Sequence, residues 1–486
     1  MSTPEVSSYV EREWRKGGAL TEDRNPARPS EVVAQVHLAD PKVAGEAVEA
    51  ARAAFPGWRS LPAPSRGEIL RKAADLLESR LDTIARDFTR EEGKTLAEAT
   101  GETRRGISIL RYYAAQTLEP DGETYPSHGA QTFLYARREA LGVVVAITPW
   151  NFPVAIPLWK IAPALAYGNT VVFKPAELVP LTAAHVAQAL HDAGLPAGVL
   201  NMVIGKSSVV GDTLVGHPMV DAISFTGSNA VGRAIQVRAT KDGKKVQLEL
   251  GGKNPAVVLA DANLAHAAEQ VARGAFMSAG QKCSATSRVI VEKSVVAEFT
   301  ERLTKAAQAM TLGDPLDPAT KVGPVVSGER LNEVLRFLSD AQHDGARALV
   351  GGRRADALGE GYFVMPTVLR DARRDSRVVR EEIFGPVAVL LEAKDYDEAV
   401  AIANDTPFGL TASLFTNDLS RAMRFANEIR AGVVKINQES AGVEFQVPFG
   451  GMKGSSSGSR EQGKVARDFF TEWKTVYIDP SPGPAA

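Results

Sequence analysis

The chain has 486 residues, which at about 150 residues per domain gives roughly three domains and a large buried core. Hydrophobic residues make up 44% and charged residues 23%, and the formal net charge of −2 excludes the broad basic surface of a general nucleic-acid-binding protein. The single cysteine, Cys283, excludes an intramolecular disulfide and any zinc site that needs two thiolates, and no metal site is predicted.

Short strands followed by helices are predicted for the first 120 residues. Val43, Ala47, Ala51 and Phe55 fall on one helical face, and residues 64–118 continue as two or three amphipathic helices. Residues 1–15 carry acidic side chains and lack a long apolar run, which is not typical of a signal or transit peptide. We therefore expect a cytoplasmic protein.

Residues 140–159 form an uncharged stretch of about the length of a membrane span. Pro149, Pro153 and Pro157 would remove backbone donors and interrupt a helix there. The stretch is therefore predicted to be a buried strand followed by an active-site loop, and no membrane contact is expected.

From residue 142 onward, apolar strands and helices alternate about every 25 residues, which predicts right-handed βαβ units and a parallel sheet. The first series places strands at 142–147, 170–173, 199–203, 222–225 and 246–249, with helices at 155–167, 181–193, 207–215 and 228–238. The second series places strands at 256–259, 287–291, 412–415 and 433–436, with helices at 264–277, 295–309, 328–342 and 420–428. Residues 480–486 are expected to be disordered.

Two segments at strand ends could hold a ligand, although the chain lacks the GxGxxG dinucleotide motif. Gly227 to Gly232 opens a helix, where backbone N–H groups attract phosphate, but Ser228 could equally be an ordinary N-cap. Lys174 and Glu177 follow another strand, where a carboxylate could accept hydrogen bonds from ribose hydroxyls and would repel a 2′-phosphate. A solvated strand end is the alternative.

Three further residues could carry chemistry. Cys283 lies among polar residues, so it is either a nucleophile whose pKa an adjacent cation or backbone dipoles would lower, or an inert thiol. Glu249 ends an apolar strand beside two glycines and needs an ion-pair partner or a catalytic role. Asn151 is a polar group in an apolar loop, which must be hydrogen-bonded or face a site.

Five motifs occur in one order along the chain: Trp150-Asn-Phe-Pro153, Glu249-Leu-Gly-Gly252, Gly280-Gln-Lys-Cys283, Glu382-Ile-Phe-Gly-Pro386 and Pro448-Phe-Gly-Gly451. With them, residues 25–475 resemble the NAD(P)-dependent aldehyde dehydrogenase superfamily. The resemblance implies an α/β fold with a Rossmann-type cofactor domain (1–120 and 142–252), an α/β catalytic domain (253–450), and a small β oligomerisation arm (121–141 with part of 451–486). It also implies a homodimer or homotetramer.

The resemblance assigns roles to individual residues. Cys283 would attack the aldehyde as a thiolate, ionised at rest; the Asn151 amide and the Cys283 N–H would stabilise the oxyanion; and Glu249 would activate the hydrolytic water. Lys160 and Glu461 would be supporting polar groups near the water path. The cofactor, NAD with NADP possible, would contact Thr148, Pro149, Trp150, Lys174, Glu177, Gly227, Ser228, Val231, Leu250 (through its backbone), Glu382 and Phe384.

The substrate is predicted from smaller likenesses. Residues 154–160, 437–448 and 454–463 resemble α-ketoglutarate semialdehyde (2,5-dioxovalerate) dehydrogenases. Such a substrate carries a carboxylate, so the site should offer a cation, for which Arg105 or Arg104 is the candidate. Both could instead be ordinary surface charges. Trp159 and Phe449 are further substrate candidates.

Other functions stay open at this point. A succinate semialdehyde or broad-specificity dehydrogenase is one alternative, although Trp159 and Met277 replace arginines often found in succinate semialdehyde dehydrogenases. A cofactor-independent cysteine hydrolase would need a histidine base near Cys283, and no histidine lies in a comparable motif. A non-enzymatic scaffold is disfavoured by intact Cys283, Glu249 and Asn151. Glu249 also favours hydrolysis over transfer to coenzyme A.

Overall fold

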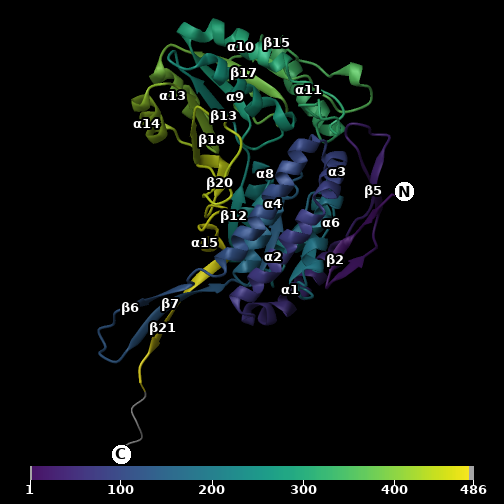
Figure 1. Ribbon diagram of the computed structural model, residues 1–486, viewed down its shortest axis with the longest axis vertical. Coiled ribbons are helices and arrows are strands. Elements are labelled where there is room, and N and C mark those ends of the chain that lie inside the picture. The colour runs from purple at the N-terminus through teal and green to yellow at the C-terminus, as the bar shows by residue number, and fades with distance from the viewer. Residues whose placement is uncertain (1–2, 481–486) are drawn as a thin grey trace, which may run out of the picture.

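The computed structural model describes residues 3–480 and contains two α/β units and a projecting β arm (Figure 1). Residues 481–486, which include most of the tail predicted to be disordered, lie outside the described residues. The predicted α/β class is confirmed by the two large sheets and the helices that cover them. Within residues 3–480, no helix is both long enough and apolar enough to cross a membrane.

The first unit is built on an eight-stranded sheet with the order β20-β12-β11-β8-β9-β10-β2-β3. Its central strands are parallel and almost wholly buried, which explains their continuous runs of Val, Ile and Ala. They are β8 (Val143–Ile147), β9 (Thr170–Lys174), β10 (Leu200–Met202), β11 (Ala222–Thr226) and β12 (Lys245–Glu249), and the antiparallel edges are β2 (Ser8–Val10), β3 (Glu13–Arg15) and β20 (Ser456–Ser457). The intervening helices are α5 (Ala155–Ala166), α6 (Pro180–Asp192), α7 (Ser207–Gly216) and α8 (Asn229–Lys241), which confirms the predicted alternation.

Four N-terminal helices pack on this unit: α1 (Pro41–Ser60), α2 (Ala63–Ser79), α3 (Leu81–Glu92) and α4 (Leu96–Gln116). A small sheet of β1 (Glu5–Val6), β5 (Val32–His37) and β4 (Leu20–Arg24) precedes them. The start of α4 is fixed by a capping box, in which Thr95 and Glu98 satisfy each other's backbone N–H groups. This helix packs on α5, so its N-terminus lies beside the loop that follows β8.

The second unit contains a seven-stranded sheet with the order β15-β16-β17-β14-β13-β18-β19. Its strands are β13 (Asn254–Val258), β14 (Thr286–Glu292), β15 (Arg347–Val350), β16 (Thr367–Arg370), β17 (Val387–Ala393), β18 (Thr411–Phe415) and β19 (Val433–Ile436). Its helices are α9 (Leu264–Phe276), α10 (Val296–Gln308), α11 (Gly328–His343), α12 (Arg377–Arg380), α13 (Tyr396–Asn404) and α14 (Leu419–Glu428). The elements from β15 to α13 were not predicted from the sequence.

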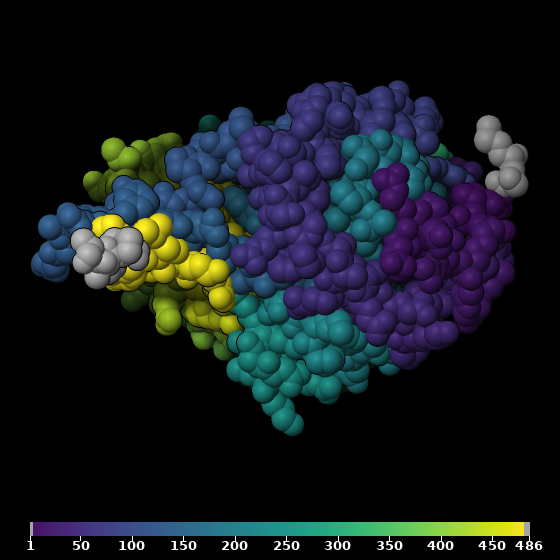
Figure 2. Space-filling model, turned by 90° about the horizontal axis from the view of Figure 1, so that it is seen from below, coloured from purple at the N-terminus to yellow at the C-terminus, as the bar shows by residue number. Residues whose placement is uncertain are grey.

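The arm is a three-stranded antiparallel sheet of β6 (Gly122–Tyr125), β7 (Phe133–Ala140) and β21 (Thr471–Ile478). The short helix α15 (Ala466–Phe470) comes directly before β21 in the chain. Strand β21 pairs with β7 from Thr471 opposite Ala140 to Ile478 opposite Phe133. Figure 2 shows the two segments, blue and yellow, side by side at one end of the molecule. The structure thus joins residues 121–141 to the C-terminal segment, while the domain boundaries and the arm's role in assembly stay predictions.

Candidate active site

Cys283 lies on a turn between α9 and β14 that begins with strained backbone. Ser278, Ala279 and Gly280 have φ values of 55°, 51° and 67°, in the left-handed region. For non-glycine residues this conformation costs about 1–3 kcal/mol each and persists only where surrounding contacts impose it. Cys283 itself is half-buried and packs against the large hydrophobic cluster of the first unit, which includes Trp159 and Phe449.

The resting state of the thiol differs from the sequence-based expectation. Burial, together with the nearby carboxylates of Glu382 and Glu249, raises the pKa of Cys283 to about 12. Lys282 does not supply the expected adjacent cation, because its Nζ donates to the carbonyl of Arg273 at 3.4 Å. The expectation of a thiolate at rest was therefore wrong: the thiol is protonated at neutral pH.

Alkylation of the resting protein by iodoacetamide should report this raised pKa. Below the pKa, each pH unit raises the thiolate fraction about tenfold, so the rate is expected to keep rising from pH 7 to pH 10, with free cysteine as the control. Because Cys283 is the only cysteine, the label counted by mass spectrometry reports this thiol alone. A rate that levels off below pH 9 would contradict the raised pKa.

Asn151 is buried in the middle of the loop between β8 and α5 and points toward the cysteine turn. Its Nδ2 donates to the carbonyl of Gln281 at 2.9 Å, two residues before Cys283. A primary amide has two N–H donors, so one remains for a ligand oxygen. The structure thus brings together the predicted nucleophile and the predicted oxyanion donor.

Glu249 ends β12 and is almost wholly buried. Its Oε2 accepts a hydrogen bond from Ser456 Oγ at 2.6 Å, while Oε1 has no partner among residues 3–480. Burial raises the pKa of Glu249 well above its ordinary value, and the charge of Glu461 adds to this effect. A buried carboxyl with a raised pKa and one free oxygen is suited to accept a proton from water.

Lys160 and Glu461 form a fully buried ion pair beside Glu249. Ser224 Oγ accepts from Lys160 Nζ at 2.9 Å and donates to Gln247 Oε1 at 3.0 Å. The Oε2 atom of Glu461 has no partner. The two predicted supporting residues are thus in contact, and Ser224 and Gln247, which the sequence analysis missed, extend the pair along β11 and β12.

The predicted cofactor residues lie at the carboxyl ends of the parallel strands, where open α/β sheets bind ligands. Thr148 follows β8, Lys174 ends β9 and Gly227 follows β11. The hydroxyls of Thr148 and Thr226 are buried there without a partner. Burial lowers the pKa of Lys174 to about 8, and its Nζ donates to the carbonyl of Pro175 at 3.2 Å. This edge therefore offers polar groups that a dinucleotide could satisfy.

Contacts at the ends of α8 and β12 bear on the remaining cofactor candidates. Ser228 Oγ caps α8 by accepting from the Val231 N–H at 3.5 Å, so the structure shows the N-cap role, and a phosphate contact stays a prediction. Val231 and Glu177 are exposed. The N–H of Leu250 donates to the Ser455 carbonyl at 2.8 Å, so only the Leu250 carbonyl could serve a ligand.

Glu382 lies close to the glycines that follow Glu249. Its Oε1 accepts from the Gly252 N–H at 2.9 Å, and a Cβ on Gly251 would lie 2.2 Å from its other carboxyl oxygen, so a larger residue at position 251 would displace the Glu382 carboxyl. Burial raises the pKa of Glu382 to about 7. Phe384 has a φ of 55° and lies edge-on to Trp150, with ring centroids 5.4 Å apart. The loop after β8, which also carries Pro149, therefore packs against the motif around Glu382.

The four substrate candidates have different surroundings. Trp159 and Phe449 are in contact, with ring centroids 5.6 Å apart, and Trp159 Nε1 is buried without a partner. Arg105 donates to the Val443 carbonyl and lines a cavity of about 640 Å³ bounded mainly by residues 433–447. Arg104 is exposed on α4. The structure thus favours Arg105 over Arg104 as a pocket cation.

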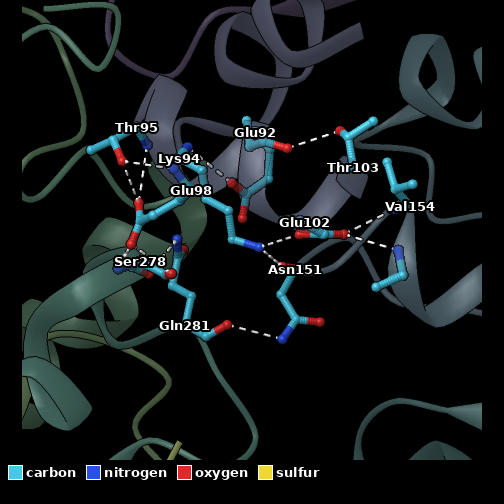
Figure 3. Close-up of polar contacts among 12 residues, drawn as sticks. Glu92, Lys94, Thr95, Glu98, Glu102, Thr103, Asn151, Val154, Ser278 and Gln281 are labelled. Atoms are coloured by element: carbon cyan, nitrogen blue, oxygen red, sulfur yellow. Dashed lines mark hydrogen bonds and ion pairs between the residues drawn. The ribbon is translucent and has the colours of Figure 1, made fainter. Parts of the chain in front are cut away.

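Several polar residues around the loop of Asn151 and the turn of Cys283 were not predicted: the buried Lys94, Glu102 and Gln281, and the partly buried Glu98 (Figure 3). A signal was present in the sequence, because Glu98 stands three residues after Thr95, as in a capping box, and Glu102 is one helical turn further. What these residues contact could not be read from that signal, since their partners lie on segments about 50 to 180 residues away.

A thiol, a side-chain amide and a buried carboxyl at the ligand-binding edge of an α/β sheet define an enzyme that attacks a carbonyl carbon through cysteine. Within residues 3–480 no histidine hydrogen-bonds the cysteine, as a cysteine hydrolase would require.

Comparison with known proteins agrees with this class. The model described as "Aldehyde dehydrogenase family" matches residues 14–476. The chain is 47% identical over 477 residues to alpha-ketoglutaric semialdehyde dehydrogenase of Bacillus subtilis, covering 97% of the chain and 98% of the relative. It is 46% identical over 480 residues to alpha-ketoglutarate semialdehyde dehydrogenase of Haloferax volcanii, covering 98% and 99%. The crystal structure of Staphylococcus aureus betaine aldehyde dehydrogenase with NAD+ superposes with a TM-score of 0.95 at 35% identity, covering 99% of this chain and 95% of that one.

The chain therefore belongs to the aldehyde dehydrogenase family, and it is an oxidoreductase that acts on aldehydes.

Proposed function

We propose that this enzyme oxidises α-ketoglutarate semialdehyde to the corresponding carboxylic acid with NAD+. The observation that carries the proposal is the presence of Cys283, Asn151 and Glu249 around one site, in a chain nearly half identical over its whole length to dehydrogenases of that semialdehyde. A succinate semialdehyde dehydrogenase is the alternative, but the two relatives favour the keto substrate.

In the proposed reaction Cys283 first gives up its thiol proton to water, its sulfur then bonds to the aldehyde carbon, and the oxyanion that forms accepts hydrogen bonds from Asn151 Nδ2 and the Cys283 N–H. When bound, NAD+ supplies the hydride acceptor and a positive charge that favours the thiolate over the thiol. Glu249 then takes a proton from the water that attacks the resulting thioester. The acid leaves, and the sulfur is released as thiolate. Aldehyde, water and NAD+ are thereby converted to acid, NADH and a proton.

The residues that would hold the dinucleotide are Lys174 and Glu177 at the ribose of adenosine, Gly227 and Ser228 at the pyrophosphate, and Glu382 at the other ribose. Glu177 supports a preference for NAD, because its carboxylate would repel a 2′-phosphate. A panel of aldehydes assayed with NAD and with NADP, followed by the absorbance of the reduced nicotinamide, tests the proposal. A higher kcat/KM for another aldehyde would contradict the proposed substrate. A higher kcat/KM with NADP would contradict the proposed preference for NAD.

The proposal also covers the oligomeric state of the enzyme and its cellular compartment. We infer a homodimer or homotetramer formed through the arm, on which Trp473, Tyr477 and Phe133 are exposed. Large exposed aromatic side chains on a projecting sheet are typical of an interface. Light scattering on the full chain tests this inference, and a monomeric mass would contradict it. The cytoplasm is the expected compartment.

Replacing Arg105 with methionine is expected to lower kcat/KM for α-ketoglutarate semialdehyde about tenfold or more, mainly through KM. Hydrogen bonds to charged groups contribute about 1.5–3 kcal/mol, and 1.4 kcal/mol corresponds to a factor of ten. Arg104→Met is the matched control on the exposed side of the same helix, and uncharged propionaldehyde is the control substrate. An unchanged KM in Arg105→Met would assign Arg105 a purely structural role through its contact with Val443.

A further inference from the structure

A closed circuit of buried and partly buried polar contacts connects the start of α4 to the loop of Asn151 and to the turn of Cys283 (Figure 3). From Lys94 the circuit runs to Asn151, from Asn151 to Gln281, and through Ser278 and Glu98 back to the segment of Lys94. None of the linking side chains other than Asn151 has a role in the reaction described above. Each contact in the circuit restricts the position of the amide or of the cysteine turn.

Lys94 holds the two residues at the tip of the loop after β8. Its side chain is 2% exposed, and its Nζ is 2.7 Å from Glu102 Oε2. The same Nζ donates to the backbone carbonyl of Asn151 and lies 3.6 Å from the centroid of the Phe152 ring. A buried ammonium is costly unless its donors are satisfied, so the contacts to Glu102 and Asn151 are held firmly.

Glu102 extends the restraint to α5. Its Oε1 accepts hydrogen bonds from the N–H groups of Val154 at 3.0 Å and Ala155 at 3.1 Å, where α5 begins without a side-chain cap of its own. A carboxylate at a helix N-terminus also interacts favourably with the helix dipole. Helix α5 carries Trp159 and Lys160, so the Lys94–Glu102 pair sets the start of the helix that lines the site.

Glu98 acts on the cysteine turn. Its Oε2 belongs to the capping box with Thr95, while its Oε1 accepts from the Ser278 N–H at 2.7 Å and the Ser278 hydroxyl at 3.0 Å. Ser278 is the first residue of the left-handed run before Cys283. The carboxylate therefore stabilises strained backbone that would otherwise relax to a different path.

Gln281 closes the circuit between the two loops. Its carbonyl accepts from Asn151 Nδ2 at 2.9 Å, and its own Oε1 accepts from the Val326 N–H at 2.9 Å. The Asn151 residue is thus held at its backbone carbonyl by Lys94 and at its side chain by the cysteine turn. Two fixed points at opposite ends of one residue determine the direction of the remaining amide N–H.

We propose that Lys94, paired with Glu102, is a positioning residue that orients the Asn151 amide toward the oxyanion formed on Cys283. The proposal rests on the function proposed above, and Lys94 acts through Asn151 without touching the substrate. Losing an oxyanion donor costs about 10²–10³ in kcat, so losing its orientation is expected to cost about 10- to 100-fold.

The test is a double-mutant cycle with Lys94→Met and Asn151→Ala, measured on aldehyde oxidation and on hydrolysis of p-nitrophenyl acetate without cofactor. We expect Lys94→Met to lower kcat of both reactions about 10- to 100-fold in the wild-type background and less than about twofold in Asn151→Ala, because the two residues act on one interaction. NADH binding, followed by its fluorescence, is expected to be unchanged. Equal losses in the two backgrounds would overturn the proposal.

The matched control is Lys244→Met, which removes another buried lysine that donates to two carbonyls, those of Val215 and His217. We expect it to lower the melting temperature while kcat stays within about twofold, so a kcat loss like that of Lys94→Met would overturn the proposal. If Lys94→Met does not fold, the same cycle is run with Glu102→Gln, which removes the charge that pairs with Lys94 and keeps a side chain of similar size. It is expected to show a smaller coupling with Asn151→Ala of the same sign, and additivity would overturn the proposal. A wild-type enzyme without aldehyde oxidation would instead contradict the proposed function.

Discussion

Replacing Cys283 with alanine is expected to lower kcat for aldehyde oxidation by about 10⁴-fold or more. Removing the nucleophile of a covalent mechanism costs up to about 10⁶-fold, because no other group can form the intermediate. Within residues 3–480 there is no second thiol and no histidine hydrogen-bonded to Cys283, so neither can replace it as the nucleophile. The measurement is steady-state NADH formation with α-ketoglutarate semialdehyde at saturating NAD.

The control for this variant is its stability. Cys283 is half-buried and its substitution removes one sulfur atom at the edge of the core, so the melting temperature is expected to fall by only a few degrees. Binding of NADH should also be retained, since the predicted cofactor residues lie on other strands. Aldehyde oxidation within tenfold of wild type in a folded Cys283→Ala variant would refute the covalent mechanism.

Replacing Glu249 with glutamine is expected to separate the two halves of the reaction. General base catalysis contributes about 10²–10⁴-fold, so steady-state turnover should fall by that factor. Hydride transfer precedes the step that needs the base, so a rapid burst of NADH should persist. Glutamine is similar in size and can still accept the hydrogen bond from Ser456, so the local structure is expected to hold. Stopped-flow absorbance of NADH measures the burst and the turnover together.

The pH profile gives this prediction a second readout. Burial and the charge of Glu461 raise the pKa of Glu249 well above its usual range, and only the carboxylate form can act as a base. The wild-type rate of thioester hydrolysis should therefore increase with pH through that raised pKa, and the increase should disappear in Glu249→Gln. Glu91→Gln is the control, because this buried carboxyl accepts from the N–H groups of Leu181 and Thr182. Loss of the burst in Glu249→Gln would contradict a role confined to hydrolysis.

Much of the fold could be predicted because its elements have strong local signals. The central parallel strands are continuous apolar runs, and helices such as α11 carry a regular apolar stripe. The region from β15 to α13 was missed although β17, with the sequence Val-Ala-Val-Leu-Leu-Glu-Ala, is itself a buried apolar run. The arm strands carry weak local signals, because β7 and β21 are stabilised mainly by pairing with each other across more than 300 residues of chain.

The amino-acid sequence by itself determined the class of the enzyme, since the residue types of its motifs and their order along the chain are local properties. Only the tertiary structure decided the electrostatic state of the site. The neighbouring residue Lys282 suggested a cation at Cys283, yet its Nζ donates to the Arg273 carbonyl instead. Burial and, after it, carboxylates from distant segments raise the pKa of the thiol. The contacts of Lys94 likewise depend on a loop far along the chain. The pKa of a buried group depends on which charges lie near it and how far it is from solvent, and the fold sets both of these distances.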